Sequence, residues 1–298
     1  MNFLRLPNFV VVGAQKSAST FIQDALCRHP DIYMPKGETR FFEDPEYGSG
    51  DITELAVLFK GRKEKALGIK RPDYLGRIEV PPRIRLKLPE AKIIIVLRNP
   101  VDRFISAYYH YIKMGFLPAI DINAVVPGLL ANQQMPDNEA AGLLSYGRYA
   151  THLRLYRQTF PDSQIRVAFH EDINADPECE LAKLCAFLEV DPDAMRSLPK
   201  AANTGVYSLP RLRLLTRRNR YLYDYDSIPG KLLPRRMTIG RLIPAAVITL
   251  ADRWFLSQVV GNPRPVLRDE LRLQLAEYYH DEIDGTAELT GRNLDTWR

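Results

Sequence analysis

Short apolar runs alternate with helical apolar patterns along the first two thirds of the chain. Three runs of mainly aliphatic residues are typical of strands buried on both faces of a sheet: Phe9–Gly13, Lys92–Leu97 and Gln164–Phe169. Apolar residues at helical spacing predict helices over four segments: Ser19–Arg28, Pro100–Lys113, Tyr146–Phe160 and Pro177–Leu188. Strands that alternate with helices imply parallel pairing. The sequence therefore predicts a three-layer α/β fold, with a central parallel sheet flanked by helices.

The length of 298 residues fits one large domain, and we expect a single domain over residues 1–298. Two stretches look irregular, at about residues 114–145 and 205–245, because turn-forming residues interrupt them. Ligands bind outside the carboxyl ends of parallel strands, so these two excursions are expected to shape one side of a ligand cleft. A last helix is expected over Leu267–Ile283.

The composition is that of an ordinary globular protein, with 46% hydrophobic and 26% charged residues. No apolar run reaches the roughly 18 residues that a membrane-spanning helix needs. The longest run, Leu242–Ala251, contains Pro244 and predicts a surface helix. No apolar core of signal-peptide length precedes Pro7, so a cytoplasmic location is the expectation. The cysteines lack metal-ligand spacing and are expected to be reduced core residues: Cys27, Cys179 and Cys185.

Positive charge is concentrated in the second excursion. Nine basic residues there face only Asp224 and Asp226, which leaves a local charge of +7 within a chain of net charge +5. The basic residues are Arg211, Arg213, Arg217, Arg218, Arg220, Lys231, Arg235, Arg236 and Arg241. Such a patch attracts a charged small molecule, a membrane surface or nucleic acid, and the alternative is an ordinary solvated face.

The sharpest motif, Gly13–Thr20, lies between a predicted strand and a predicted helix. Such a turn points backbone N–H groups and a helix N-terminus at one spot, which suits a phosphate. Lys16 adds a positive charge, while Ser17, Ser19 and Thr20 can donate hydroxyl hydrogen bonds. The alternative is a plain glycine turn in which Ser19 caps the helix.

The loop departs from the nucleoside-triphosphate motif, which requires four residues between the first glycine and Gly-Lys. Only two residues separate Gly13 from Lys16. The second strand also ends in Arg98 instead of a magnesium-binding aspartate. Positive charge in place of a metal suits a nucleotide handled without magnesium. Glu171 and Asp172 follow the third strand, so an acidic residue that binds a metal is still possible there.

A second constellation runs from Arg98 to Tyr108. Arg98 leaves the end of a strand, and Ser106 lies two turns along the following helix. The guanidinium offers a planar fork for two phosphate contacts, which a serine hydroxyl can complete. The alternative pairs Arg98 with an acidic neighbour and leaves Ser106 as a packing residue.

Together these elements resemble the sulfotransferase family, cytosolic and heparan-type, which uses 3′-phosphoadenosine 5′-phosphosulfate (PAPS). The first motif is similar to the family's 5′-phosphosulfate loop, which implies these donor-binding residues: Gln15, Lys16, Ser17, Ala18, Ser19 and Thr20. The second is similar to its 3′-phosphate motif, Arg-Asn-Pro-x-x-Arg-x-x-Ser-x-Tyr, which implies Arg98 and Ser106. The likeness favours a P-loop-like fold.

Two further segments resemble the heparan-type branch. Pro35–Phe42 is similar to its Lys-Glu-x-x-Phe-Phe segment, whose glutamate is the catalytic base, and this implies Glu38. Ile69–Tyr74 is similar to its Lys-Thr-Pro-x-Tyr segment, whose lysine lies beside the transferred group, and this implies Lys70. The likeness continues through 146–172 and 267–297.

The chain also departs from the family pattern. Ala18 stands where the family usually has glycine, Gly37 is inserted between Lys36 and Glu38, and Arg71 replaces a threonine. The family's glycine-rich adenine and 3′-phosphate loop has no clear counterpart here. Arg264 and Arg268 are weak candidates for that role.

The resemblance implies in-line transfer of a sulfuryl group to a hydroxyl or amine, with adenosine 3′,5′-bisphosphate as product and no required metal. Glu38, beside two aromatic residues, is expected to be desolvated and to take the acceptor proton. Lys16 would neutralise the leaving phosphate, and Lys70 would hold the sulfuryl oxygens. His110 is a minor candidate for the site. The basic excursion suits an anionic glycan or a lipid-linked acceptor, with peripheral membrane contact and no nucleic acid.

Two other functions stay open. A small-molecule kinase with a variant phosphate loop would turn over ATP with magnesium. A non-catalytic nucleotide-binding or membrane-surface module would instead use the basic stretch and the apolar segment Leu242–Val260.

Overall fold

The computed structural model describes residues 5–132, 141–195, 197–199, 205–225, 232–236 and 238–298. The chain forms two compact units. The first, here called the sheet unit, holds Met1–Asn99, Arg148–Ala202 and Asp281–Asp295. The second, here called the helical unit, holds Pro100–Gly147, Asn203–His280 and Thr296–Arg298. The single-domain expectation stays a prediction, and each unit is described by itself.

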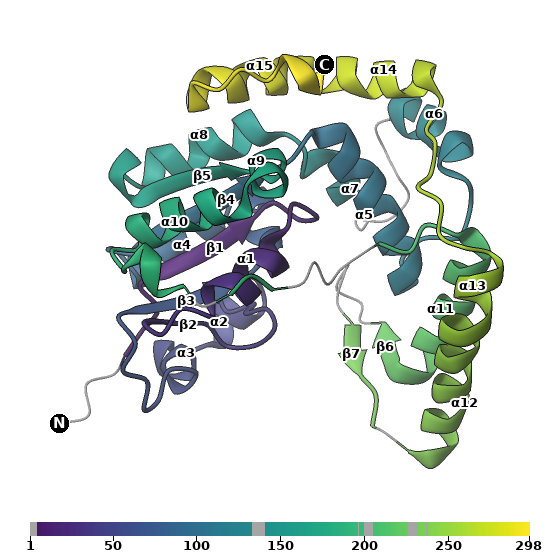
Figure 1. Ribbon diagram of the computed structural model, residues 1–298, viewed down its shortest axis with the longest axis horizontal. Helices are drawn as coiled ribbons and strands as arrows, with labels where there is room; N and C mark the ends of the chain where they lie inside the picture. Colours follow the sequence, from purple (N-terminus) through teal and green to yellow (C-terminus); the bar gives the residue numbers. More distant parts are fainter. Residues whose placement is uncertain (1–4, 133–140, 196, 200–204, 226–231, 237) are drawn as a thin grey trace. The chain divides into compact units, whose positions relative to one another are not determined.

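Five parallel strands form the centre of the sheet unit, in the order β2-β3-β1-β4-β5 (Figure 1). Their bounds are β1 Phe9–Gly13, β2 Ile32–Tyr33, β3 Ala66–Lys70, β4 Lys92–Leu97 and β5 Ile165–Phe169. The three predicted strands are confirmed. Strand β3 was not predicted from the sequence, because Gly68 interrupts its short apolar run. A side chain at Gly68 would collide with the ring of Phe9 on β1, so that glycine lets the two strands pair.

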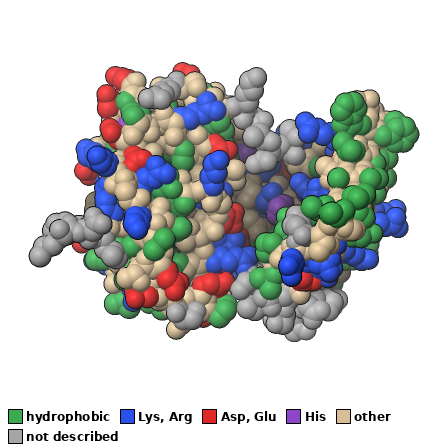
Figure 2. Space-filling view, turned by 90° about the horizontal axis from the view of Figure 1, so that it is seen from below, with side chains coloured by type: hydrophobic (Ala, Val, Ile, Leu, Met, Phe, Trp, Pro, Cys, Tyr) green, Lys and Arg blue, Asp and Glu red, His purple; other side chains and the backbone are tan. Residues whose placement is uncertain are grey.

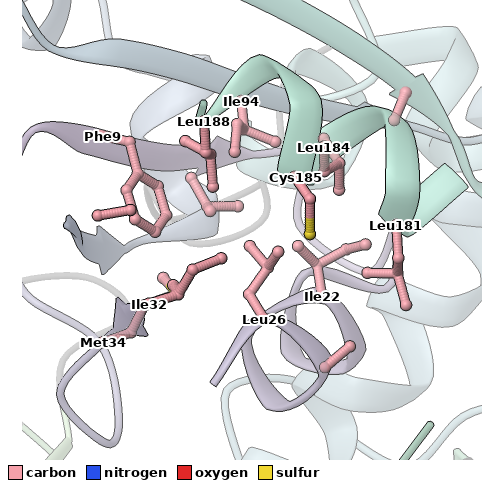
Figure 3. Packing of buried hydrophobic residues seen from close by; sticks show 14 of the residues in the cluster. Phe9, Ile22, Leu26, Ile32, Met34, Ile94, Leu181, Leu184, Cys185 and Leu188 are labelled. Carbon is pink, nitrogen blue, oxygen red and sulfur yellow. The ribbon is translucent and has the colours of Figure 1, made fainter. Parts of the chain in front are cut away.

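Helices cover both faces of this sheet. On one face, α1 (Ser19–Leu26) and α10 (Pro177–Phe187) contact each other and pack on alternate residues of β1 and β4. Figure 3 shows Phe9 and Ile94 meeting Ile22, Leu26 and Leu184 there. Helices α4 (Val80–Lys87) and α8 (Tyr149–Thr159) contact each other as the second helical layer. The predicted three-layer α/β fold is therefore confirmed.

The remaining helices of this unit are short or peripheral: α2 Glu46–Ser49, α3 Ile52–Val57, α9 His170–Ala175 and α15 His280–Thr290. Helix α15 packs closely on α8, since a Cβ at Gly285 would lie 2.8 Å from that of Ala150. The single last helix expected over Leu267–Ile283 is wrong. The chain forms α14 (Asp269–Tyr278) and α15, and the break at Tyr279 lies where that side chain is fully buried.

One cysteine prediction holds and two are wrong. All three cysteines are free, and Cys185 lies in the core beside Leu181 (Figure 3). Cys27 and Cys179 are exposed. Cys27 follows the last residue of α1 and Cys179 lies in the first turn of α10, so each falls near a helix end beyond the packed face.

The helical unit contains these elements: α5 Pro100–Met114, α6 Ile122–Asn132, α7 Ala141–Ser145, α11 Leu209–Leu222, β6 Tyr223–Tyr225, β7 Leu232–Pro234, α12 Ile239–Leu250, a π-helix Ala251–Leu256, α13 Ser257–Val259 and α14. Helix α11 packs against both α5 and α12. Strands β6 and β7 pair antiparallel.

The two excursions expected to be irregular are mostly helical where the structure describes them. Turn-forming residues suggested irregular chain, but Pro210 lies in the first turn of α11, where its missing N–H is not needed. Pro127 and Pro244 lie inside α6 and α12. Residues 133–140, Asp226 and Lys231 lie outside the described residues.

The apolar run Leu242–Ala251 was predicted to form a surface helix, and α12 confirms it. Across the described ranges, no helix combines the length and the apolar character needed to cross a bilayer.

Replacement of Leu184 by alanine tests the packing between α10 and the sheet. Leu184 is fully buried in that core, so Leu184→Ala should lower the free energy of unfolding by about 2–5 kcal/mol. Leu86→Ala is the matched control, because Leu86 is 72% exposed on α4 and its truncation should change stability by less than about 0.5 kcal/mol. Chemical denaturation of both variants measures the difference. Equal effects would contradict the described core.

Candidate active site

The loop after β1 connects the central strand to α1, as predicted. Its backbone is tied to the neighbouring strand, since Ala14 N donates to Val96 O over 2.6 Å. Lys16 and Ala18 both adopt left-handed backbone, with φ of 67° and 70°. Gly13 admits no side chain, because a Cβ there would lie 2.7 Å from Pro72 O. The loop is therefore a tight turn held against both neighbours of β1.

The hydroxyl groups of this loop differ in their surroundings. Ser17 is fully buried, and its Oγ has no hydrogen-bond partner within the described ranges. Ser19 is the first residue of α1 and does not cap it, because the N-cap position is Ala18. Thr20 Oγ1 accepts from Lys70 Nζ over 3.1 Å. A buried hydroxyl without a partner is unfavourable by about 1–3 kcal/mol, and an oxygen of a bound anion would satisfy it.

Arg98 leaves β4 beside this loop. Its Nη1 donates to Lys16 O over 3.2 Å, and no acidic residue of the described chain forms an ion pair with it. The alternative in which Arg98 pairs with an acid therefore has no support among the described residues. Ser106 lies on α5 in the helical unit, where it is largely buried. Its predicted phosphate contact stays a prediction.

The two acids that follow β5, Glu171 and Asp172, both make structural contacts. Glu171 Oε1 accepts from the backbone N–H of Asn99 over 2.9 Å, just before α5 begins. Both carboxylate oxygens of Asp172 accept from Arg292, over 2.5 and 2.7 Å. Glu171 thus fixes the chain after Arg98, and Asp172 joins α9 to the segment after α15.

Lys70 ends β3, directly beside β1, and is only 4% exposed. Its Nζ lies 3.1 Å from Thr20 Oγ1 and 3.9 Å from Glu38 Oε1. Burial lowers the pKa of Lys70, an effect that Glu38 and Asp24 oppose only in part. The structure therefore brings the loop after β1, Lys70 and Glu38 together, as the motifs implied.

The segment that carries Glu38 is held at three points. Gln23 of α1 donates to Pro35 O over 2.8 Å, and Thr39 N donates to Lys70 O over 3.1 Å. Tyr74 OH donates to Thr39 O as well. The inserted Gly37 has a φ of 90°, a left-handed conformation that glycine adopts without strain. These contacts place Glu38 beside the end of β3.

The expected desolvation of Glu38 is wrong. Its side chain is 38% exposed, whereas Phe41 and Phe42 turn inward. The two rings pack edge-on against each other, and Phe42 packs edge-on against Tyr74. The aromatic pair therefore anchors the segment in the core without covering the carboxylate.

Arg71 is the residue that the sequence reasoning missed. Its guanidinium pairs with three carboxylates, over 2.6 Å to Glu38, 2.5 Å to Glu43 and 2.7 Å to Asp73. Burial by itself lowers the pKa of Arg71, but the three carboxylates raise it well above its ordinary value. The available signal was the arginine in place of threonine, with several acids nearby in sequence.

The other predicted residues lie in the helical unit. Arg268 donates from its backbone N–H to Asn123 Oδ1 over 2.8 Å, and its side chain donates to Asn123 O. Arg264 is exposed, and His110 is partly buried on α5. Their proposed roles toward a nucleotide or acceptor stay predictions.

Comparison with known protein families identifies the family of this chain. Residues 6–204, well over half of the chain, match the family described as "Sulfotransferase domain". The chain belongs to the sulfotransferase family. This confirms the predicted family, and at the level of the family it confirms the predicted enzyme class.

A solved structure supports the fold of this sulfotransferase chain. This chain superimposes on the sulfotransferase from Alicyclobacillus acidocaldarius with a TM-score of 0.68 and 22% sequence identity. The alignment covers 99% of each chain. At that identity the likeness shows the fold alone.

Two human proteins are among the curated relatives. Bifunctional heparan sulfate N-deacetylase/N-sulfotransferase 2 is 29% identical over 204 residues, which is 63% of this chain and 22% of the relative. Heparan sulfate glucosamine 3-O-sulfotransferase 6 is 30% identical over 185 residues, which is 62% of this chain and 52% of the relative. The chain therefore aligns with about a fifth and about half of these two proteins.

Substitution of Ala18 by glycine tests the strain in the loop. A left-handed alanine is unfavourable by roughly 1–2 kcal/mol, so Ala18→Gly should raise the free energy of unfolding by about 0.5–1 kcal/mol. The same change inside α10, Ala182→Gly, is the control and should lower stability by about 1 kcal/mol. Denaturant titration gives both values. A loss of stability in Ala18→Gly would refute the strained conformation.

Proposed function

We propose that this chain transfers a sulfuryl group from PAPS to a hydroxyl or amine of an acceptor and releases adenosine 3′,5′-bisphosphate. The family supports this proposal, and one observation carries it. A buried lysine ammonium lies between a hydroxyl of the loop after β1 and the carboxylate of Glu38, 3.1 and 3.9 Å away. A hydroxyl, an ammonium and a carboxylate thus lie together at the carboxyl edge of one parallel sheet, and this supports the proposed donor loop, charge neutralisation and proton transfer.

The donor's 5′-phosphosulfate fits the loop after β1. The Oγ of Ser17 is buried and has no partner in the described chain, so a donor oxygen would satisfy it. Lys16 supplies positive charge to the phosphate that leaves. Arg98 offers its guanidinium fork to the 3′-phosphate, with Ser106 as the second contact. In this proposal lysine, arginine and backbone dipoles stabilise the transition state without a metal.

Glu38 is proposed as the base that takes the acceptor proton. The Oε2 atom is fixed by Arg71 over 2.6 Å, which leaves Oε1 as the proton acceptor. As the acceptor oxygen or nitrogen bonds to sulfur, the bond from sulfur to the donor phosphate oxygen breaks. The Lys70 ammonium, 3.9 Å from Oε1, is positioned to bind a sulfuryl oxygen. Arg71 serves as a positioning residue for Glu38.

The proposed acceptor is a hydroxyl or amine of a glycan. Support comes from the names of the relatives, one an N-sulfotransferase and one a 3-O-sulfotransferase of heparan sulfate. The basic side chains of α11 suit an anionic chain of this kind, because Arg213, Arg217 and Arg220 are all exposed. A cytoplasmic location with membrane contact is likewise a proposal.

Calorimetric titration with adenosine 3′,5′-bisphosphate tests the donor site. We expect micromolar binding, weakened about 10- to 100-fold by Lys16→Ala and by Arg98→Ala, since each removes one charged contact to phosphate. Lys60→Ala, an exposed change in the sheet unit, should leave the affinity unaltered. ADP with magnesium is titrated in parallel. Preference for ADP with magnesium would support the kinase alternative and overturn this proposal.

Glu38→Gln tests the catalytic base. The amide keeps the shape of the side chain but cannot accept the proton, so kcat should fall about 10²- to 10⁴-fold. Binding of adenosine 3′,5′-bisphosphate should stay within about twofold. Glu90→Gln, at an exposed position, is the matched control with full activity. Activity is measured as sulfuryl transfer from PAPS to a panel of glycans. Unchanged kcat in Glu38→Gln would exclude Glu38 as the base, and donor binding without transfer would favour a non-catalytic module.

A further inference from the structure

The helices that follow β7 expose an unusual number of large apolar side chains. Helix α12, the π-helix and α13 together cover Ile239–Val259. Helix α12 packs against α11. The buried side chains of this segment are Ala245 and Asp252, the latter paired with Arg211 over 2.8 Å. One side of the segment is thus held by the protein.

The opposite side of α12 is apolar as well. Large apolar residues recur there at steps of three or four and continue into the π-helix at Trp254, and they are between 56% and 76% exposed: Ile239, Ile243, Val247, Leu250 and Trp254. Phe255 and Val259 extend the same exposure toward the end of the segment. Residues at this spacing share one face of a helix, and a solvent-facing helix normally carries polar residues there. We call these seven residues the exposed apolar face.

Positive charge borders the exposed apolar face. Arg253 is exposed next to Trp254, and Arg236 is exposed just before α12. Helix α11, which packs on the buried side of α12, exposes further arginines of the same unit, at 213, 217 and 220. Figure 2 shows hydrophobic and basic side chains side by side over this part of the helical unit, at the right of the view.

An apolar helix face bordered by arginines indicates which kind of partner this surface binds. Isoleucine, leucine, tryptophan and phenylalanine on one helix face, with arginine at the border, match a helix lying in the headgroup layer of a bilayer. Anionic headgroups would neutralise the bordering arginines. A second copy of the chain fits less well, because a twofold contact sets the same patch against itself and brings like charges together.

We propose that the exposed apolar face docks in the plane of a bilayer surface that contains anionic lipids. This proposal does not depend on the sulfotransferase activity. It assigns α12 and α13 as a membrane-surface anchor that does not span the bilayer.

Vesicle co-sedimentation of the full chain tests the proposal. The probe is a vesicle of three parts phosphatidylcholine to one part phosphatidylglycerol, compared with phosphatidylcholine alone. Binding should be stronger to the anionic vesicle and should weaken as salt is added. The double variant Val247→Glu/Leu250→Glu should reduce partitioning at least about tenfold, because it places two charges where apolar side chains enter the membrane.

The matched control changes exposed apolar residues in the sheet unit. Ile78→Glu/Leu86→Glu adds the same two charges at positions that are 75% and 72% exposed, and it should bind vesicles like the unaltered chain. Tryptophan fluorescence provides a second readout. The chain has two tryptophans, and Trp297 is buried, so a blue shift on vesicle binding reports Trp254.

Three results would overturn the proposal. The first is equal loss of binding in the control and the test variant, which would indicate a general charge effect. The second is absence of binding to the anionic vesicles. The third is an unaltered chain that does not bind vesicles and is a dimer by light scattering, while Val247→Glu/Leu250→Glu is a monomer. That result would show that a second copy covers this face.

Discussion

Two adjacent buried cations, at the end of β3 and just after it, organise the carboxyl edge of the sheet. Lys70 and Arg71 are both almost fully buried, and a buried charge is tolerated only when polar groups surround it. Lys70 is satisfied by Thr20 and Glu38, and Arg71 by three carboxylates. These contacts reach the start of α1, the segment before α2 and the turn after β3. The two charges therefore fix the position of three separate pieces of chain.

The neighbouring loop has the opposite character, because its favourable contacts are incomplete. Ser17 Oγ is buried without a partner in the described chain, and two residues that are not glycine adopt left-handed backbone. Such features are unfavourable in the isolated protein and are stabilised only by surrounding structure or by a ligand. The anchoring of the loop to β4, through Ala14 and through Arg98, provides that surrounding structure. A loop anchored in this way, with an unsatisfied hydroxyl donor, is suited to an anionic ligand.

The helical unit depends on a different constraint. Helix α12 has a buried side, held by α11, and an apolar side that nothing in the described chain covers. Burial of that second side in a headgroup layer would remove apolar surface from water, which is the driving force for interfacial helices. Arg253, exposed next to Trp254, and Arg236, exposed just before α12, supply positive charge beside the face that needs an anionic partner.

The sequence by itself determined the elements whose patterns are local. The strands β1, β4 and β5 are runs of mainly aliphatic residues, and such a run predicts a buried strand from its own residues alone. The motif residues at the strand ends were likewise predictable, because parallel strands present their carboxyl ends at one edge. Strand β3 was not predictable, because the glycine at position 68 is required by the ring of Phe9 on the neighbouring strand.

Only the tertiary structure decided which side chains became buried and paired. The aromatic residues after Glu38 turned toward Tyr74 and left the carboxylate partly exposed. Arg71 became the centre of an ion-pair network, and the described parts of the two stretches expected to be irregular are mostly helical. Burial, ion pairing and helix packing depend on residues far apart in the chain, so no local pattern contains them. Local periodicity fixed the framework, and long-range packing placed the charges that give the site its chemistry.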